Sequence, residues 1–291
     1  MSLGSFLDEA KDLVNAELDR VLPSPDQEPK RLHEAMRYAI FAGGKRLRPA
    51  IAIAACRAVG GEDREAFSAA CALEMLHTYS LIHDDLPAID DDDLRRGRPT
   101  CHKAYGDATA ILAGDALQTE AFRVLAEETA RPEAIVALVR ELANASGTHG
   151  MVGGEIADIE AEGAAPDLDR VMWIHERKTA ALFRASAVMG GIAGGADEAT
   201  CRALAEYGTS LGLAFQVVDD ILDETEDAET LGKSPGKDRA AGKMTTPAAI
   251  GLERSRTLAR DHAGSARKAL EGVSDASVLA GLVDLAVERS S

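Results

Sequence analysis

Two acidic clusters carry the strongest chemical signal in this sequence. The first is Asp84-Asp85 with Asp90 to Asp93, and the second is Asp219-Asp220 with Asp223. Each follows a long and strongly apolar stretch, where the acids of a solvated helix face are unusual. Carboxylates with room for several waters, and no soft ligands beside them, suit Mg²⁺ better than Zn²⁺. The pattern predicts metal ions held between two helices, where they could bridge to a diphosphate.

Local geometry supports a shared site within each cluster. On a helix, Asp219 and Asp223 are four residues apart and lie on one face, so both carboxylates can reach a single ion. Pro87 disfavours helix at the residue before it, so we expect Asp90 to return toward Asp84 through a distorted turn. A single acidic run is most often a solvated face or a helix cap. Two runs at the ends of apolar helices instead require cations, because the burial of unpaired carboxylates near a core costs free energy.

Basic and polar residues that could meet an anionic substrate lie in several segments. The segment from Gly43 to Pro49 (GGKRLRP) combines a permissive backbone with three cations, which suits the binding of a diphosphate. Arg95-Arg96 directly follows the first acidic cluster, where local charge balance is the alternative role. Further candidates are His77, Lys178, Thr179 and Gln216, and Lys233, Lys237 and Lys243 in a glycine-rich loop that we interpret as a lid. Taken singly, His77 and Gln216 could equally be ordinary core residues.

The elements that must position these residues are helical. Apolar residues recur at helical spacing in runs such as Glu65 to Leu86, Ala108 to Ala130 and Ala199 to Leu222, and few stretches alternate as strands do. Aromatic residues make up only 4% of the chain, and alanine and leucine dominate the apolar set, which favours closely packed helices. Asp167 and Asp197 are predicted N-caps. We expect one all-α domain over residues 1–291, a bundle of roughly ten or more helices.

Charge and composition exclude several classes of function. A formal net charge of −17 argues against a nucleic acid or an anionic membrane surface as partner. The four cysteines are scattered and form no ligand pattern, so we expect them to be reduced. The segment from Met1 to Arg20 reads as a surface helix without the features of a signal peptide. No apolar stretch approaches the ~20 residues of a membrane span, and a cytoplasmic location is expected.

Taken together, these segments resemble the polyprenyl synthetase family, specifically its bacterial farnesyl diphosphate synthase branch. The resemblance covers roughly Gly43 to Pro247, and its motifs occur in the family's order. They are GGKRLRP at Gly43, LIHDDLPAIDDDDLRRGRPTCH at Leu81, ILAGDALQ at Ile111, GGEIADIEAEG at Gly153, HERKTAAL at His175, GLAFQVVDDILD at Gly212 and TLGKSPGKD at Thr230. One departure is Glu155, where relatives commonly carry Gln.

The resemblance implies an all-α fold with a central cavity, a homodimer, and three Mg²⁺ ions on the allylic diphosphate. The implied metal residues are Asp84, Asp85, Asp90, Asp219, Asp220 and Asp223, with Asp84, Asp90 and Asp219 as direct ligands. Isopentenyl diphosphate is assigned to Lys45, Arg48, His77 and Arg96. The allylic diphosphate is assigned to Arg95, Lys178 and Lys233, with Lys243 as a weaker candidate. Thr179, Gln216 and the backbone carbonyl of Lys178 are expected to face the developing allylic cation.

The expected product is farnesyl diphosphate, with geranylgeranyl diphosphate as the alternative. Tyr79 lies five residues before Asp84, ~7.5 Å along the helix axis, and Ser80 lies four before it. In this family an aromatic residue at that point resembles the floor of a fifteen-carbon pocket, although ordinary core packing would also explain it. A class I terpene cyclase and a non-catalytic synthase subunit are the rival functions. A terpene cyclase would not need a second diphosphate site, and a non-catalytic subunit would tend to lose one of the two aspartate motifs.

Overall fold

The computed structural model describes residues 2–225 and 242–288, and these form helices apart from one short hairpin. In chain order the elements are α1 (Leu3–Val21), α2 (Lys30–Ile40), α3 (Leu47–Ala58), α4 (Asp63–Asp84), β1 (Leu94–Arg95), β2 (Arg98–Pro99), α5 (Cys101–Tyr105), α6 (Asp107–Glu128), η1 (Pro132–Ala134), α7 (Ile135–Ser146), α8 (Met151–Ala161), α9 (Leu168–His175), η2 (Glu176–Ala180), α10 (Ala181–Ala193), α11 (Glu198–Thr225), α14 (Thr246–Ile250), α15 (Leu252–Ala269), η3 (Leu270–Gly272) and α16 (Ser277–Glu288). The all-α prediction is confirmed.

Helix α10 lies at the centre of the bundle and packs against α3, α4, α7 and α11. Small side chains make this packing close. A Cβ on Gly190 of α10 would lie 2.1 Å from the backbone oxygen of Ala52 in α3, so this contact requires glycine. The alanine-rich composition therefore lets the backbones of neighbouring helices approach and leaves little room for aromatic residues.

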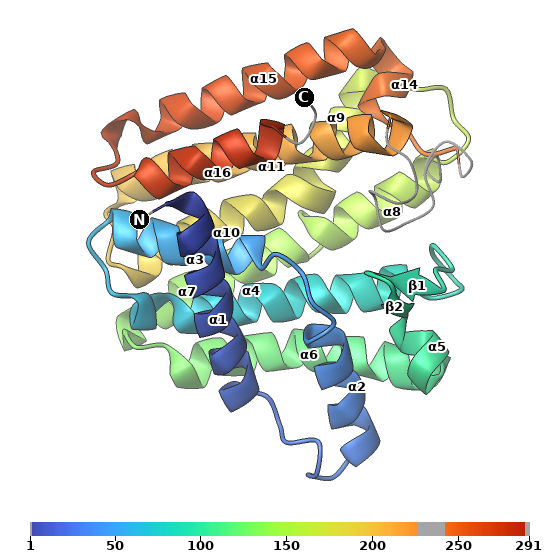
Figure 1. Cartoon of the computed structure of the whole chain (residues 1–291), viewed down its shortest axis with the longest axis vertical. Helices are drawn as coiled ribbons and strands as arrows, with labels where there is room; N and C mark the ends of the chain where they lie inside the picture. The colour runs from blue at the N-terminus through green and yellow to red at the C-terminus, as the bar shows by residue number, and fades with distance from the viewer. Residues whose placement is uncertain (1, 226–241, 289–291) are drawn as a thin grey trace.

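The two helices that carry the acidic clusters end on the same side of the molecule (Figure 1). Helix α4 begins with a capping box between Glu62 and Glu65, and residues all around its circumference are buried. It ends at Asp84, three residues before Pro87. Helix α11 runs for 28 residues and carries its acids in its last two turns. The fold thus brings both clusters to one end of the bundle.

The predicted element boundaries need small corrections. The run expected from Glu65 begins at Asp63 and ends at Asp84, because the chain turns before Pro87. The antiparallel hairpin β1–β2, with Leu94 opposite Pro99, was not predicted. Both predicted caps are confirmed, since Asp167 accepts a hydrogen bond from the Arg170 amide and Asp197 accepts one from the Thr200 amide.

Cys56, Cys71, Cys101 and Cys201 all carry free thiols. Among the described residues, no helix combines the length and the apolar character needed to cross a membrane.

Candidate active site

Two adjoining cavities lie where α4 and α11 end. One has a volume of about 490 Å³ and a largely apolar wall, and the other has a volume of about 370 Å³ and a polar wall. Asp84 of α4, Asp219 and Gln216 of α11, and Lys178 and Thr179 of η2 line both. The two acidic clusters therefore meet in one continuous space, as the sequence predicts.

The first acidic cluster folds back on the end of α4. The amide of Asp90 donates to the backbone oxygen of Asp84 at 2.8 Å, which is the distorted turn expected from Pro87. Both side chains line the polar cavity. Desolvation, and then the nearby charge of Glu155, raises the pKa of Asp84 to about 7. A cation in this cavity would relieve that repulsion.

Asp85 points away from the two cavities. Its carboxylate accepts from Arg95, whose Nη2 lies 2.6 Å from Oδ1 and whose Nε lies within 3.0 Å of both oxygens. Arg95 itself lines both cavities. Asp85, which the sequence predicts to bind metal, thus holds the guanidinium of Arg95 at the cavity wall.

All three acids of the second cluster line the polar cavity. Asp219 and Asp223 line the polar cavity, as expected for two residues four apart on a helix. Asp220 is buried, and its carboxylate accepts from the amide of Thr246 at 2.8 Å, from the Thr246 hydroxyl at 3.1 Å and from Gln216 Nε2 at 3.1 Å. These contacts already fill most of the acceptor positions of Asp220.

A π-helical turn, η2, presents Lys178 and Thr179 to the cavities. Turns of this kind are rare and occur mostly at functional sites. The turn packs tightly against α8, because a Cβ on Gly154 would lie 2.2 Å from the Lys178 backbone nitrogen. The Thr179 hydroxyl donates to Gln216 Oε1 at 2.7 Å. Since Gln216 also donates to Asp220, its amide is held in one orientation.

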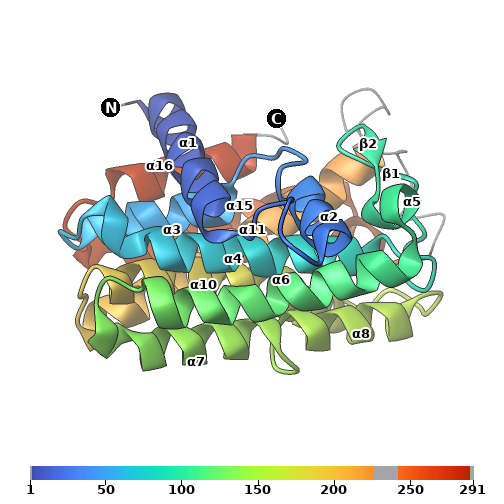
Figure 2. The same cartoon turned by 90° about the horizontal axis from the view of Figure 1, so that it is seen from below.

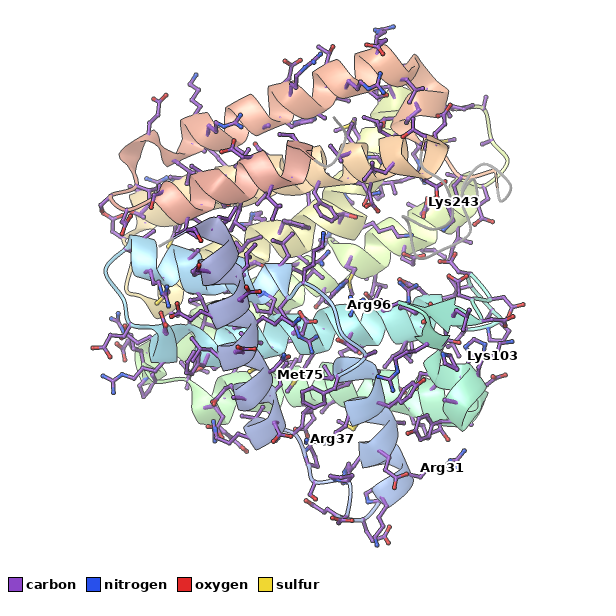
Figure 3. The ribbon with its side chains drawn as sticks, in the orientation of Figure 1. Arg31, Arg37, Met75, Arg96, Lys103 and Lys243 are labelled. Carbon is purple, nitrogen blue, oxygen red and sulfur yellow. The ribbon has the colours of Figure 1, made fainter. Side chains whose placement is uncertain are left out.

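Two lysines stand opposite the carboxylates of the polar cavity. Lys178 Nζ lies 2.6 Å from Asp158 and 2.8 Å from Glu155. Lys243, labelled in Figure 3, lies 3.0 Å from Asp90. Desolvation acts to lower the pKa of Lys178, but the charges of Asp158 and Glu155 outweigh it and raise the pKa. Lys178 is therefore a cation at any working pH. Lys233 lies outside the described residues.

A second group of anion-binding side chains, two arginines and a histidine, lies at the apolar cavity. Arg48, His77 and Arg96 line it, whereas Lys45 is exposed and lines neither cavity. Arg48 Nε is buried without a hydrogen-bond partner in the described part of the chain, and burial lowers the pKa of Arg48 to about 10. Desolvation and the neighbouring arginines lower the pKa of His77 well below its usual value. This group can accept an anion without a metal ion.

The apolar cavity continues along α4 past the acids. Tyr79 and Ser80 line it, and the Tyr79 ring packs edge-on against His83 with 5.4 Å between the ring centroids. Val152, Ile156 and Ile159 of α8 form another part of the wall. The wall suits a branched hydrocarbon tail that extends from the acidic end.

Sequence reasoning missed two residues that hold the site together: Asp158, which binds Lys178, and Thr246, which binds Asp220. It named Glu155 as a departure from the family pattern but did not predict its contact with Lys178. Asp158 lies three residues after Glu155, so helical spacing could have indicated a shared face. Nothing local in the sequence links Thr246 to Asp220, because this contact spans a long segment of the chain.

The donor set of the polar cavity fits Mg²⁺. Asp84, Asp90, Asp219 and Asp223 offer only oxygen ligands around a space large enough for waters. Within residues 2–225 and 242–288, no group of three or more histidine, cysteine or acidic side chains forms a ready-made metal site. Mg²⁺ is often coordinated by one or two carboxylates together with substrate phosphates and waters, so it does not require such a group.

Comparison with known proteins gives consistent results. The model of the polyprenyl synthetase family matches residues 29–277. The large subunit 1 of a chloroplastic heterodimeric geranylgeranyl pyrophosphate synthase from Arabidopsis thaliana is 49% identical over 289 residues, which cover 97% of this chain and 77% of the relative.

Two solved structures share the fold over nearly their whole length. The FPP/GFPP synthase of Zymomonas mobilis has a TM-score of 0.88 and 38% identity, with 98% of each chain covered. A geranyltransferase of Helicobacter pylori, complexed with magnesium and isoprenyl diphosphate, has a TM-score of 0.86 and 33% identity, with 99% of this chain and 97% of that chain covered.

Proposed function

Because the chain belongs to the polyprenyl synthetase family, we propose that this prenyltransferase condenses isopentenyl diphosphate with allylic diphosphates to give geranylgeranyl diphosphate. One observation carries the proposal. Two acidic helix ends border two adjoining cavities, with Lys178 and Lys243 at the polar cavity and Arg48 and Arg96 at the apolar cavity. A terpene cyclase needs one diphosphate site, whereas a condensation of two diphosphates needs both. Both aspartate clusters are present, which is a feature of a catalytic subunit.

The polar cavity holds the allylic substrate. Asp84, Asp90 and Asp219 are the proposed ligands of Mg²⁺, with Asp223 beside them. When bound, Mg²⁺ supplies positive charge to the diphosphate oxygens as that group departs. Lys178 and Lys243 line the same cavity and donate to the same diphosphate. Asp85 and Asp220 take a positioning role, because they fix Arg95 and Gln216.

The reaction follows from the placement of charge. The allylic C–O bond breaks and its electron pair leaves with the diphosphate. The resulting cation faces the oxygens of Thr179 and Gln216, which are held toward the cavity. The double bond of isopentenyl diphosphate, anchored by Arg48, His77 and Arg96, then attacks the cation. A proton leaves the new carbon chain for the released diphosphate. The apolar wall keeps water from the cation.

Two features favour different chain lengths. The curated relative from Arabidopsis thaliana bears the name of a geranylgeranyl synthase and is 49% identical, which favours twenty carbons. The Tyr79 ring in the cavity wall favours fifteen, so farnesyl diphosphate is the second candidate. The farnesyl product expected from the sequence is therefore ranked second.

Incubation with isopentenyl diphosphate, an allylic starter and Mg²⁺ tests both proposals. Dimethylallyl, geranyl and farnesyl diphosphate serve as starters, and the products are dephosphorylated and sized. A twenty-carbon alcohol that is absent from the EDTA control supports the main proposal. A fifteen-carbon end product supports the second candidate. No condensation from any starter would contradict both and favour a cyclase or a regulatory subunit.

Replacing Tyr79 with Ala should lengthen the product by at least one five-carbon unit. Tyr79 is 6% exposed and borders the apolar cavity about one and a half helical turns before Asp84, so removal of its ring opens space for the growing tail. Sizing of the products at saturating substrate measures the change. Tyr79→Phe keeps the ring and serves as the matched control, with unchanged products. An unchanged length in Tyr79→Ala would show that the cavity ends elsewhere.

We also propose that the enzyme is a homodimer. Five large apolar side chains are at least 38% exposed on α6 and α8: Ile111, Leu112, Val152, Ile156 and Ile159. Figure 2 shows both helices on the same side of the molecule. A second copy of the chain would bury this surface. Light scattering after size exclusion should give twice the monomer mass, and Leu112→Glu should shift it toward the monomer. A wild-type monomer would favour a heteromeric partner, as in the Arabidopsis relative's name.

A further inference from the structure

A buried ion pair lies directly behind the proposed isopentenyl diphosphate site. Glu74 is in the middle of α4 and is only 3% exposed, next to Met75, which Figure 3 labels. Arg46, at the start of α3, is 4% exposed, and its Nη1 lies 2.5 Å from Glu74 Oε1. Burying two charges is expensive, and such pairs are often replaceable by apolar residues without loss of stability. Stability is therefore a weak explanation for this pair.

The Arg46 guanidinium ties three other segments to the loop that carries it. Its Nε donates to Asn15 Oδ1 at 3.0 Å, and its Nη2 donates to the backbone oxygen of Ile40 at 2.6 Å. Together with Glu74, these contacts join α1, the end of α2 and α4. They hold Arg46 in a left-handed conformation, with φ of 50°, that a residue with a side chain seldom adopts. The loop backbone is thus fixed from inside the protein.

The loop presents cations on either side of this anchor. Lys45 precedes Arg46, and Arg48 follows it by two residues, within the first turn of α3. Arg96 packs on the same loop, since it donates to the Gly43 carbonyl and would clash with any side chain at Gly44. The charge of Glu74 also partly offsets the effect of burial on the pKa of Arg48. One buried acid therefore supports both the geometry and the charge of the whole group.

We infer that Glu74 is a positioning residue for isopentenyl diphosphate, which acts by holding Arg46 and thereby the loop with Lys45 and Arg48. This inference rests on the proposed function. Glu74 touches no substrate and lines neither cavity. Its removal should weaken the metal-free cationic site and leave the aspartate-rich site intact, because Glu74 has no contact with the acids that face Mg²⁺.

Glu74→Gln tests this inference through the two substrates separately. The KM for isopentenyl diphosphate should rise about tenfold or more, as expected for the loss of roughly 1.4 kcal/mol of binding. The KM for the allylic substrate should stay within about twofold. The matched control is Glu141→Gln, which removes a partly buried carboxylate from Arg184 away from both cavities and should change neither KM. An equal rise in both values, or a fall in kcat alone, would overturn the inference.

A second variant covers the case in which Glu74→Gln fails to fold. Arg46→Met combined with Glu74→Leu leaves no charge unpaired in the core, so the protein should fold. The isopentenyl diphosphate KM should still rise, because the tethers to Asn15 and Ile40 are gone. A wild-type KM in this double variant would show that the pair is structural only.

Binding without catalysis separates this inference from the proposed function. Calorimetry with isopentenyl diphosphate in EDTA probes only the cationic site and needs no turnover. If the wild-type protein fails to condense any starter, the proposed function fails, and about tenfold weaker binding by Glu74→Gln would still support the positioning role. Equal binding by both proteins would overturn it.

Discussion

Replacing Asp84 with Asn should lower kcat by a factor on the order of 10²–10³, comparable to the loss of one strong electrostatic contact to a transition state. Asp84 lies where α4 ends and borders both cavities together with Asp219. Loss of its charge removes a proposed ligand of Mg²⁺ at the point where the diphosphate leaves. Steady-state kinetics at saturating Mg²⁺ and substrates measures the effect, and Asp219→Asn should behave in the same way.

The fold should survive this change. The pKa of Asp84 is raised to about 7 in the folded protein, so its ionisation opposes folding as pH rises from the unfolded value through 7. Asn removes that cost, and at pH 8 in EDTA the melting temperature should stay equal or increase. Asp93→Asn is the matched control, because Asp93 is exposed and pairs with Lys103 outside the cavities. A near-normal rate in Asp84→Asn would refute the metal assignment.

The parts of the site that the sequence predicts are those fixed by local geometry. Pro87 forces the turn that returns Asp90 to Asp84, and the contact appears at 2.8 Å. Helical spacing places Gln216 against Asp220, and the contact appears at 3.1 Å. In both cases, residues within a few positions of each other determine the result. The all-α class follows in the same way from the periodicity of apolar residues.

The parts that the sequence does not predict depend on contacts between distant segments. The π turn at η2 cannot be told from an α-helix by periodicity, and its close contact with Gly154 of α8 joins segments more than 20 residues apart. Likewise, Asp85 looks like a metal ligand in the motif, but the hairpin folds Arg95 back onto it. The strand pairing in this hairpin spans only two residues per strand, too few to show as alternation.

The length of the product cannot be predicted from the sequence for the same reason. Tyr79 can be placed on α4 by counting from Asp84, but the wall opposite it comes from α8. Val152, Ile156 and Ile159 are exposed apolar residues that also border the cavity. The length of the tail that fits therefore depends on α4 and α8 together and on what covers α8. A single aromatic position is not enough to fix the product.

Replacing Lys178 with Met should reduce kcat by a factor on the order of 10²–10³, with a smaller effect on the KM for isopentenyl diphosphate. Lys178 Nζ lies beside Asp158 and Glu155 and borders both cavities. Its charge therefore stands where negative charge builds on the departing diphosphate. Single-turnover experiments with the allylic substrate measure the chemical step directly.

Loss of Lys178 also removes the ion-pair partner of Glu155 and Asp158, so a second variant is needed to separate charge repulsion from lost catalysis. Lys178→Met combined with Glu155→Gln removes one of those acids and should regain stability without regaining rate. Lys103→Met is the matched control, because Lys103, labelled in Figure 3, also pairs with acids of the first cluster but borders neither cavity. Recovery of kcat in the double variant would mean that Lys178 serves only to neutralise Glu155. A persistent loss would mean that its cation acts on the leaving diphosphate.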